Sequence, residues 1–152
     1  SKIDLLLFYG MPLALGFLSW NFEIVAQRAV YELSVSVFAI FSALLLSVQV
    51  AMYGVFKSER KSLSDRVLDD SARDKAEEMR GLLRELNTNI SYLILLSCLS
   101  VSIFLIFFAV NLPPSIETGG LIAIYTHFIL TLAMVLKRAH VVFDTEYRIS
   151  IR

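Results

Sequence analysis

Two stretches of this chain are too long and too apolar to be ordinary helices of a water-soluble domain. Leu33–Phe56 runs for 24 residues without a charge, and Ile90–Leu112 runs for 23. A helix crosses the hydrocarbon core of a bilayer with about 20 apolar residues. The whole chain is 57% apolar and 18% charged, against about 45–50% and about 25% in soluble domains. The sequence therefore predicts an integral membrane protein and argues against a soluble enzyme.

Two weaker apolar segments complete the expected architecture. Residues 119–136 are apolar and end at a Lys-Arg pair, and residues 3–20 are apolar but contain Pro12. A signal peptide is the alternative for residues 3–20, although no clear small-x-small cleavage site follows them. The prediction is an all-α, single-domain chain (1–152), a four-transmembrane-helix bundle with spans near 3–20, 33–56, 90–112 and 119–136. Pro113-Pro114 ends the third span, because proline cannot continue a helix.

The charges are distributed unevenly between the connecting segments. Residues 57–89 hold eight Lys or Arg, the tail 137–152 holds four, and Lys2 adds one. The two segments expected on the other side of the membrane contain a single basic residue, Arg28. Positive charge marks cytoplasmic segments. We therefore expect a multi-pass membrane protein with both termini in the cytoplasm and the lipid bilayer as its surroundings.

The charged segment 57–89 has the pattern of a helical hairpin that extends the second and third spans into the cytoplasm. Ser71 and Asp74 resemble a capping box, which predicts a helix start near residue 71. Apolar residues then recur at heptad-like spacing as far as the third span. They are Ala72, Ala76, Met79, Leu83, Leu86 and Ile90. This seam either packs the two arms of the hairpin together or binds another subunit or a soluble partner, for which Ala76, Met79, Leu83 and Leu86 are the candidates. The tail ends in Arg148–Arg152, which alternates like a short strand.

Small residues lie four apart on the second span. They are Ala39, Ala43, Ser47 and Ala51, and Gly10 with Ala14 forms a shorter version in the first span. Small residues at this spacing let two helix backbones approach closely in a membrane. The stripe either packs within one bundle or joins subunits of a homo-oligomer, for which a tetramer is one form.

His127 and Gln49 are the polar side chains in the spans that need an explanation. An ionisable group inside a membrane is a functional candidate, and histidine changes charge near neutral pH. The alternative for His127 is a structural hydrogen bond to a serine of the third span, such as Ser100 or Ser102. The amide of Gln49 needs partners away from lipid, whereas the span serines can bond to carbonyls of their own helix.

Sequence motifs for chemistry are missing. The chain has no phosphate-binding glycine loop, no H-E-x-x-H, no nucleophile elbow and no Cys/His cluster, and Cys98 is its single cysteine. The formal net charge is zero, which does not suit direct nucleic-acid binding. We therefore expect no enzyme activity, no catalytic residue, no metal and no cofactor.

The chain combines two spans with a charged helical hairpin (57–89), a short turn at Asn111–Pro114 and a polar tail (137–152). This layout resembles the membrane subunits of Kiwa-type anti-phage defence. The resemblance covers the whole chain as architecture, without a diagnostic motif. It implies a homo-oligomeric sensor that signals to a cytoplasmic partner through its hairpins. The expected function is an oligomeric inner-membrane sensor or scaffold in antiviral defence, and the alternative is a homo-oligomeric ion channel or membrane-depolarising effector.

Overall fold

The computed structural model describes residues 6–64, 70–110 and 112–150, with side chains described for 6–54, 80–110 and 112–141. Within these residues the protein is all-helical and contains no strand. The elements are the π-helix η1 (Leu6–Gly10) and the α-helices α2 (Met11–Asn21), α3 (Arg28–Ser64), α4 (Asp70–Ala109) and α5 (Pro114–Ser150). The all-α prediction is confirmed for the described residues.

Three helices are much longer than a bilayer is thick. α3 and α5 have 37 residues each and α4 has 40, which gives lengths of about 55–60 Å against a hydrocarbon core of about 30 Å. Each contains a segment long and apolar enough to cross a membrane: Arg28–Gly54, Arg80–Ala109 and Pro114–Val141. These three helices indicate a membrane protein.

The first apolar segment forms a shorter helix. Leu6–Asn21 is apolar but falls below the length of the three candidate spans, so the predicted fourth span is not confirmed. The segment begins in π-helical geometry before Pro12. Pro12 lacks the N–H group that would bond the Phe8 carbonyl in an α-helix, which favours a wider turn at this point.

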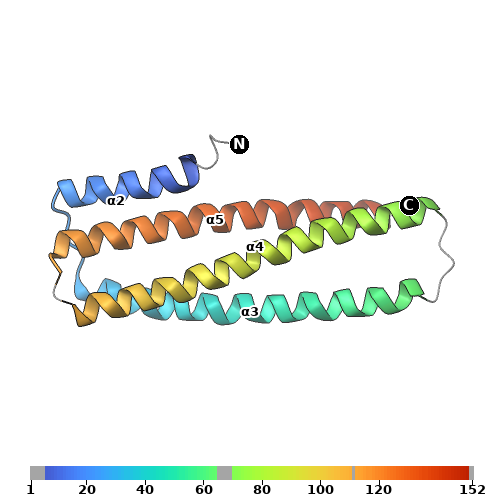
Figure 1. Cartoon of the computed structure of the whole chain (residues 1–152), viewed down its shortest axis with the longest axis horizontal. Coiled ribbons are helices and arrows are strands. Elements are labelled where there is room, and N and C mark those ends of the chain that lie inside the picture. The colour runs from blue at the N-terminus through green and yellow to red at the C-terminus, as the bar shows by residue number, and fades with distance from the viewer. Residues whose placement is uncertain (1–5, 65–69, 111, 151–152) are drawn as a thin grey trace.

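Figure 1 shows how the helices are arranged. α3, α4 and α5 run alternately up and down the long axis, and α2 lies along the first half of α5. α2 packs extensively against α5, while α4 packs against both α3 and α5. We call the end with the connections 22–27 and 110–113 the short-loop end, and the opposite end the long-helix end. The described chain is therefore a three-helix bundle with α2 on its side, and the four-span bundle stays a prediction.

The buried face of α4 continues the heptad spacing seen in the sequence. Its buried residues are Leu86, Ile90, Leu93, Ser97, Ser100 and Phe104. Leu86 and Ile90 belong to the predicted seam, and the later positions extend the same spacing through the span. One helix face therefore packs inside the chain from residue 86 to residue 104.

Aromatic rings fill the centre of the three-helix bundle. Phe38 of α3 is fully buried, and its ring centroid lies 5.7 Å from that of Phe104, 5.1 Å from that of Tyr125 and 4.9 Å from that of Phe128. Such tilted and edge-on pairs stabilise by more than the area they bury. Phe38 thus joins α3 to both α4 and α5.

α5 differs from the prediction at both ends. It begins at Pro114, five residues before the expected span, because proline suits the first turn of a helix. It then continues to Ser150, so the strand-like reading of the tail is wrong for the described residues up to 150. A single helix therefore runs from the short-loop end through the predicted tail.

The connections at the short-loop end meet at one hydroxyl. Thr118 is 2% exposed, and its Oγ1 donates to the Pro114 carbonyl at 2.8 Å. The same oxygen accepts from the Ala26 N–H at 2.9 Å and interacts with the Tyr31 hydroxyl at 3.1 Å. Since its hydrogen is already donated to Pro114, Thr118 accepts both other bonds. One side chain thus joins the 22–27 connection, α3 and α5.

Candidate functional site

His127 is the centre of a polar cluster where η1, α4 and α5 meet. Its Nδ1 lies 3.0 Å from the Phe8 carbonyl oxygen, and its Nε2 lies 2.9 Å from the Tyr92 hydroxyl. Tyr9 adds a ring contact, with its centroid 5.2 Å from that of His127. The side chain is half-buried. The serine alternative is wrong, because the two ring nitrogens bond to Phe8 and Tyr92 and neither bonds to Ser100 or Ser102.

The contacts of His127 define its tautomer. A carbonyl oxygen only accepts hydrogen bonds, so Nδ1 carries a hydrogen and donates it to Phe8. In the neutral ring Nε2 then accepts from the Tyr92 hydroxyl. Both ring nitrogens therefore have a hydrogen-bond partner, as a polar side chain within an apolar span requires.

The Phe8 carbonyl is available because of the local sequence. In an α-helix it would accept from residue 12, and Pro12 has no N–H to give. The missing N–H group of Pro12 therefore accounts both for the π-turn before it and for the hydrogen bond that the Phe8 carbonyl accepts from His127. His127 thus holds the beginning of the apolar amino-terminal segment against α5, and Tyr92 links this contact to α4.

Removing the imidazole is expected to loosen η1. In His127→Phe the Phe8 carbonyl loses its side-chain donor and Tyr92 loses its acceptor, while the ring volume is kept. We expect a loss of about 1–3 kcal/mol of local stability, seen as faster amide hydrogen exchange in residues 6–12. Tyr92→Phe removes one of the two bonds and should give a smaller increase. Tyr53→Phe is the control, because the Tyr53 side chain is 71% exposed. Equal amide hydrogen exchange of residues 6–12 in the wild type and the three variants would contradict the role of His127 in holding η1.

The side-chain amide of Gln49 has a polar hydrogen-bond partner, as predicted from the sequence. Its Nε2 donates to the Ser91 hydroxyl at 2.8 Å, and Ser91 in turn donates to the Asn87 carbonyl at 3.0 Å. This pair connects α3 to α4. The expectation that the span serines bond to their own helix is confirmed for Ser34, Ser36, Ser47, Ser91, Ser97, Ser100 and Ser102.

The small-residue stripe of α3 is on an unoccupied face. Ala39, Ala43, Ser47 and Ala51 are all exposed, so within the described residues the stripe does not pack against another helix of the chain. In the first segment Gly10 is half-buried and Ala14 is exposed. The face that α2 buries consists of Pro12, Gly16 and Ser19 instead.

The close approach of two helices occurs at residues that the sequence analysis did not select. A Cβ atom on Gly16 would lie 2.7 Å from the Gly119 carbonyl oxygen, and one on Gly119 would lie 2.8 Å from the Gly16 carbonyl oxygen. The two backbones therefore touch where neither residue has a side chain. The signal in the sequence was Gly119 four residues before Ala123, a small-xxx-small pattern.

The predicted hairpin residues fall into two groups. The side chains of Ala76 and Met79 lie outside the described residues. Leu86 is 6% exposed, and Leu83 is half-buried against the core. For Leu86 the intramolecular alternative is therefore the one that the structure supports.

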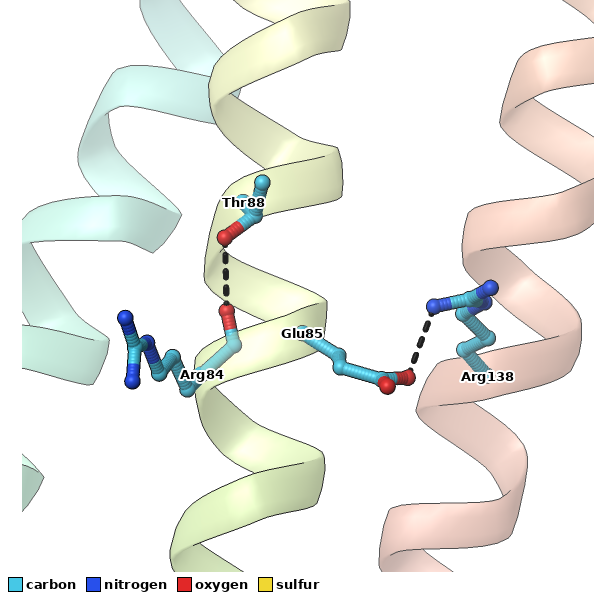
Figure 2. A network of polar contacts seen from close by, with 4 residues as sticks. All are labelled: Arg84, Glu85, Thr88 and Arg138. Carbon is cyan, nitrogen blue, oxygen red and sulfur yellow. Dashed lines mark hydrogen bonds and ion pairs between the residues drawn. The ribbon is translucent and has the colours of Figure 1, made fainter.

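An ion pair connects the predicted hairpin to the predicted tail. Arg138 Nη1 of α5 donates to Glu85 Oε2 of α4 at 2.8 Å (Figure 2). Thr88 Oγ1 donates to the Arg84 carbonyl at 2.9 Å, and the Arg84 side chain points away from α5. Both partners of the ion pair are exposed, so it adds little to stability. It does show that α4 and α5 lie side by side at Glu85 and Arg138.

Comparison with known proteins adds no relative. No protein-family model, curated protein or solved structure matches the chain.

Proposed function

We propose that the protein is a non-enzymatic, oligomeric sensor or scaffold of the bacterial inner membrane that recruits a cytoplasmic protein at its long-helix end. The observation that carries the proposal is the length of α3, α4 and α5, which are about twice as long as a membrane span requires. Connecting two spans needs only a short loop, as the 110–113 connection illustrates. The resemblance to Kiwa-type membrane subunits extends this proposal to antiviral defence.

The proposed binding surface for the cytoplasmic protein consists of exposed residues of α4. Arg80, Arg84 and Glu85 are exposed, whereas the Leu86 side chain is buried by packing within the chain. Arg84 is the best candidate, because its side chain points away from α5 (Figure 2) and has no partner among the described side chains. Charged groups of this kind determine which partner binds and how fast it binds.

The surface for a second copy of the chain is the small-residue stripe of α3. Lipid chains offer no hydrophobic drive for helix association, so close backbone contact between small residues supplies it. The exposed positions Ala39, Ala43, Ser47 and Ala51 suit that contact. The channel alternative has less support, because the described span serines donate mainly to carbonyls of their own helix.

A single detergent extract tests both the partner-binding surface of α4 and the small-residue stripe of α3. The full chain is extracted from its native membrane in mild detergent, and its mass and co-purifying proteins are measured. We expect an oligomer with a bound cytoplasmic protein for the wild type. Ala43→Leu should reduce the oligomer to the monomer, because the larger side chain separates the backbones, and Arg84→Glu should lose the partner.

The controls are matched on the same helices. Leu44→Ala, beside the stripe on α3, should keep the oligomer, and Arg80→Lys, which preserves charge on α4, should keep the partner. A wild-type monomer without a co-purifying protein would refute the proposal. Ion flux into liposomes between pH 5 and 8 would instead support the channel alternative.

A further inference from the structure

A polar pocket opens at the short-loop end between the first turns of α3 and α5 and the last turn of α4. Its volume is about 280 Å³, and its lining includes Arg28, Tyr31, Phe108 and Glu117. All three candidate spans have an end here, at Arg28, Ala109 and Pro114. The pocket therefore lies at the level where apolar helices leave the hydrocarbon core and meet lipid headgroups.

The pocket holds one positive and one negative side chain that form no ion pair with each other or with another described residue. The Arg28 guanidinium lies 5.2 Å from the centre of the Phe108 ring. Among the described residues neither this guanidinium nor the Glu117 carboxylate has a hydrogen bond or an ion pair. The first turns of α3 and α5 both line the pocket, and the positive end of a helix dipole favours a negatively charged group. The site thus offers donors for an anion beside an acceptor for a cation.

We propose that this pocket binds the headgroup of phosphatidylethanolamine. Its phosphate would be bound by Arg28 and the first turn of α3, and its ammonium would donate hydrogen bonds to Glu117. A guanidinium and a phosphate form the strongest class of hydrogen-bonded ion pair. A headgroup without an ammonium leaves Glu117 unpaired, and a choline headgroup has no N–H to donate. Both therefore fit less well.

An apolar groove beside the pocket suits an acyl chain of the same lipid. Its volume is about 580 Å³, and Phe107 lines both cavities. The other walls include Leu13, Phe17 and Trp20 of α2 with Ile116 and Gly120 of α5. The groove therefore extends from the headgroup level along the apolar face between α2 and α5. A lipid that enters both cavities places its polar and apolar parts in matching surroundings.

The test measures lipid binding to the delipidated full chain by native mass spectrometry. Phosphatidylethanolamine is expected to bind about fivefold more tightly than phosphatidylcholine or phosphatidylglycerol with the same acyl chains. Glu117→Gln should abolish this preference, and Arg28→Gln should weaken all three lipids about fivefold. Glu32→Gln removes an exposed carboxylate near the start of α3 outside the pocket lining and should change nothing.

The possible outcomes are distinct. Equal binding of the three lipids, a preference for phosphatidylglycerol, or an unchanged preference in Glu117→Gln would overturn the headgroup site. Glycerophosphoethanolamine, which has the headgroup without acyl chains, should not bind at concentrations that saturate with the lipid. If it binds equally well, the groove has no part in the site. The proposal depends on the membrane setting but not on the sensor function, so the failure of one leaves the other standing.

Discussion

Gly119→Ala is expected to separate α2 from α5 and to cost about 1–3 kcal/mol of stability. The added methyl group would lie 2.8 Å from the Gly16 carbonyl oxygen, and a backbone atom cannot move aside as a flexible side chain can. Gly119→Leu should have a larger effect of the same kind. Trp20, the only tryptophan in the chain, reports on this contact, because its Cβ would lie 3.7 Å from a Cβ on residue 119. Its fluorescence should shift in both variants.

The same substitution at another glycine is the control. Gly81 of α4 has no atom within 4 Å of an added Cβ, so Gly81→Ala should be neutral or stabilising by up to about 1 kcal/mol. Thermal unfolding in detergent compares the variants. If Gly119→Ala unfolds at the same temperature as Gly81→Ala and leaves the Trp20 emission unchanged, then α2 does not pack on α5 through these glycines.

Phe38→Ala is the second substitution with a large expected effect, a loss of about 3–5 kcal/mol. The side chain is fully buried and contacts the rings of Phe104, Tyr125 and Phe128. In a membrane the removed atoms are not transferred to water, so the loss arises from the cavity and from the dispersion contacts that its walls no longer make.

The control for Phe38→Ala is Leu44→Ala on the same helix. Leu44 is 58% exposed, so its replacement removes atoms that face lipid rather than the core. The helical signal is followed by circular dichroism against temperature in detergent. Phe38→Ala should melt well below the wild type and Leu44→Ala close to it. Similar melting of the two variants would mean that the aromatic cluster does not hold the three long helices together.

The sequence was sufficient for features that depend on a single helix. The uncharged runs located α3 and α4, and the heptad spacing identified Leu86 and Ile90 as one face of α4. The carbonyl acceptors of the span serines were also predictable, since they lie four residues away on the same helix. The need of Gln49 for a polar partner followed from its amide alone.

Features that depend on two distant segments were not predictable in this way. Gly16 and Gly119 are 103 residues apart, and α2 is apolar on every side, so its pattern does not reveal which face is buried. The sequence pattern therefore favours Gly10 and Ala14 instead. One partner of His127 is a main-chain carbonyl that Pro12 leaves without a helical donor, and the other is the Tyr92 hydroxyl of a different helix, so neither follows from the sequence around His127.

The packing of α2 on α5 has a consequence for the order of events during synthesis. Gly119 comes 98 residues after the end of α2 at Asn21. At about 5–20 residues per second the ribosome needs about 5–20 s to add them. During this interval α2 has left the ribosome before the glycine surface that it packs on has been made. α2 is therefore synthesised several seconds before the helix on which it packs, and its docking waits until that part of α5 has been made.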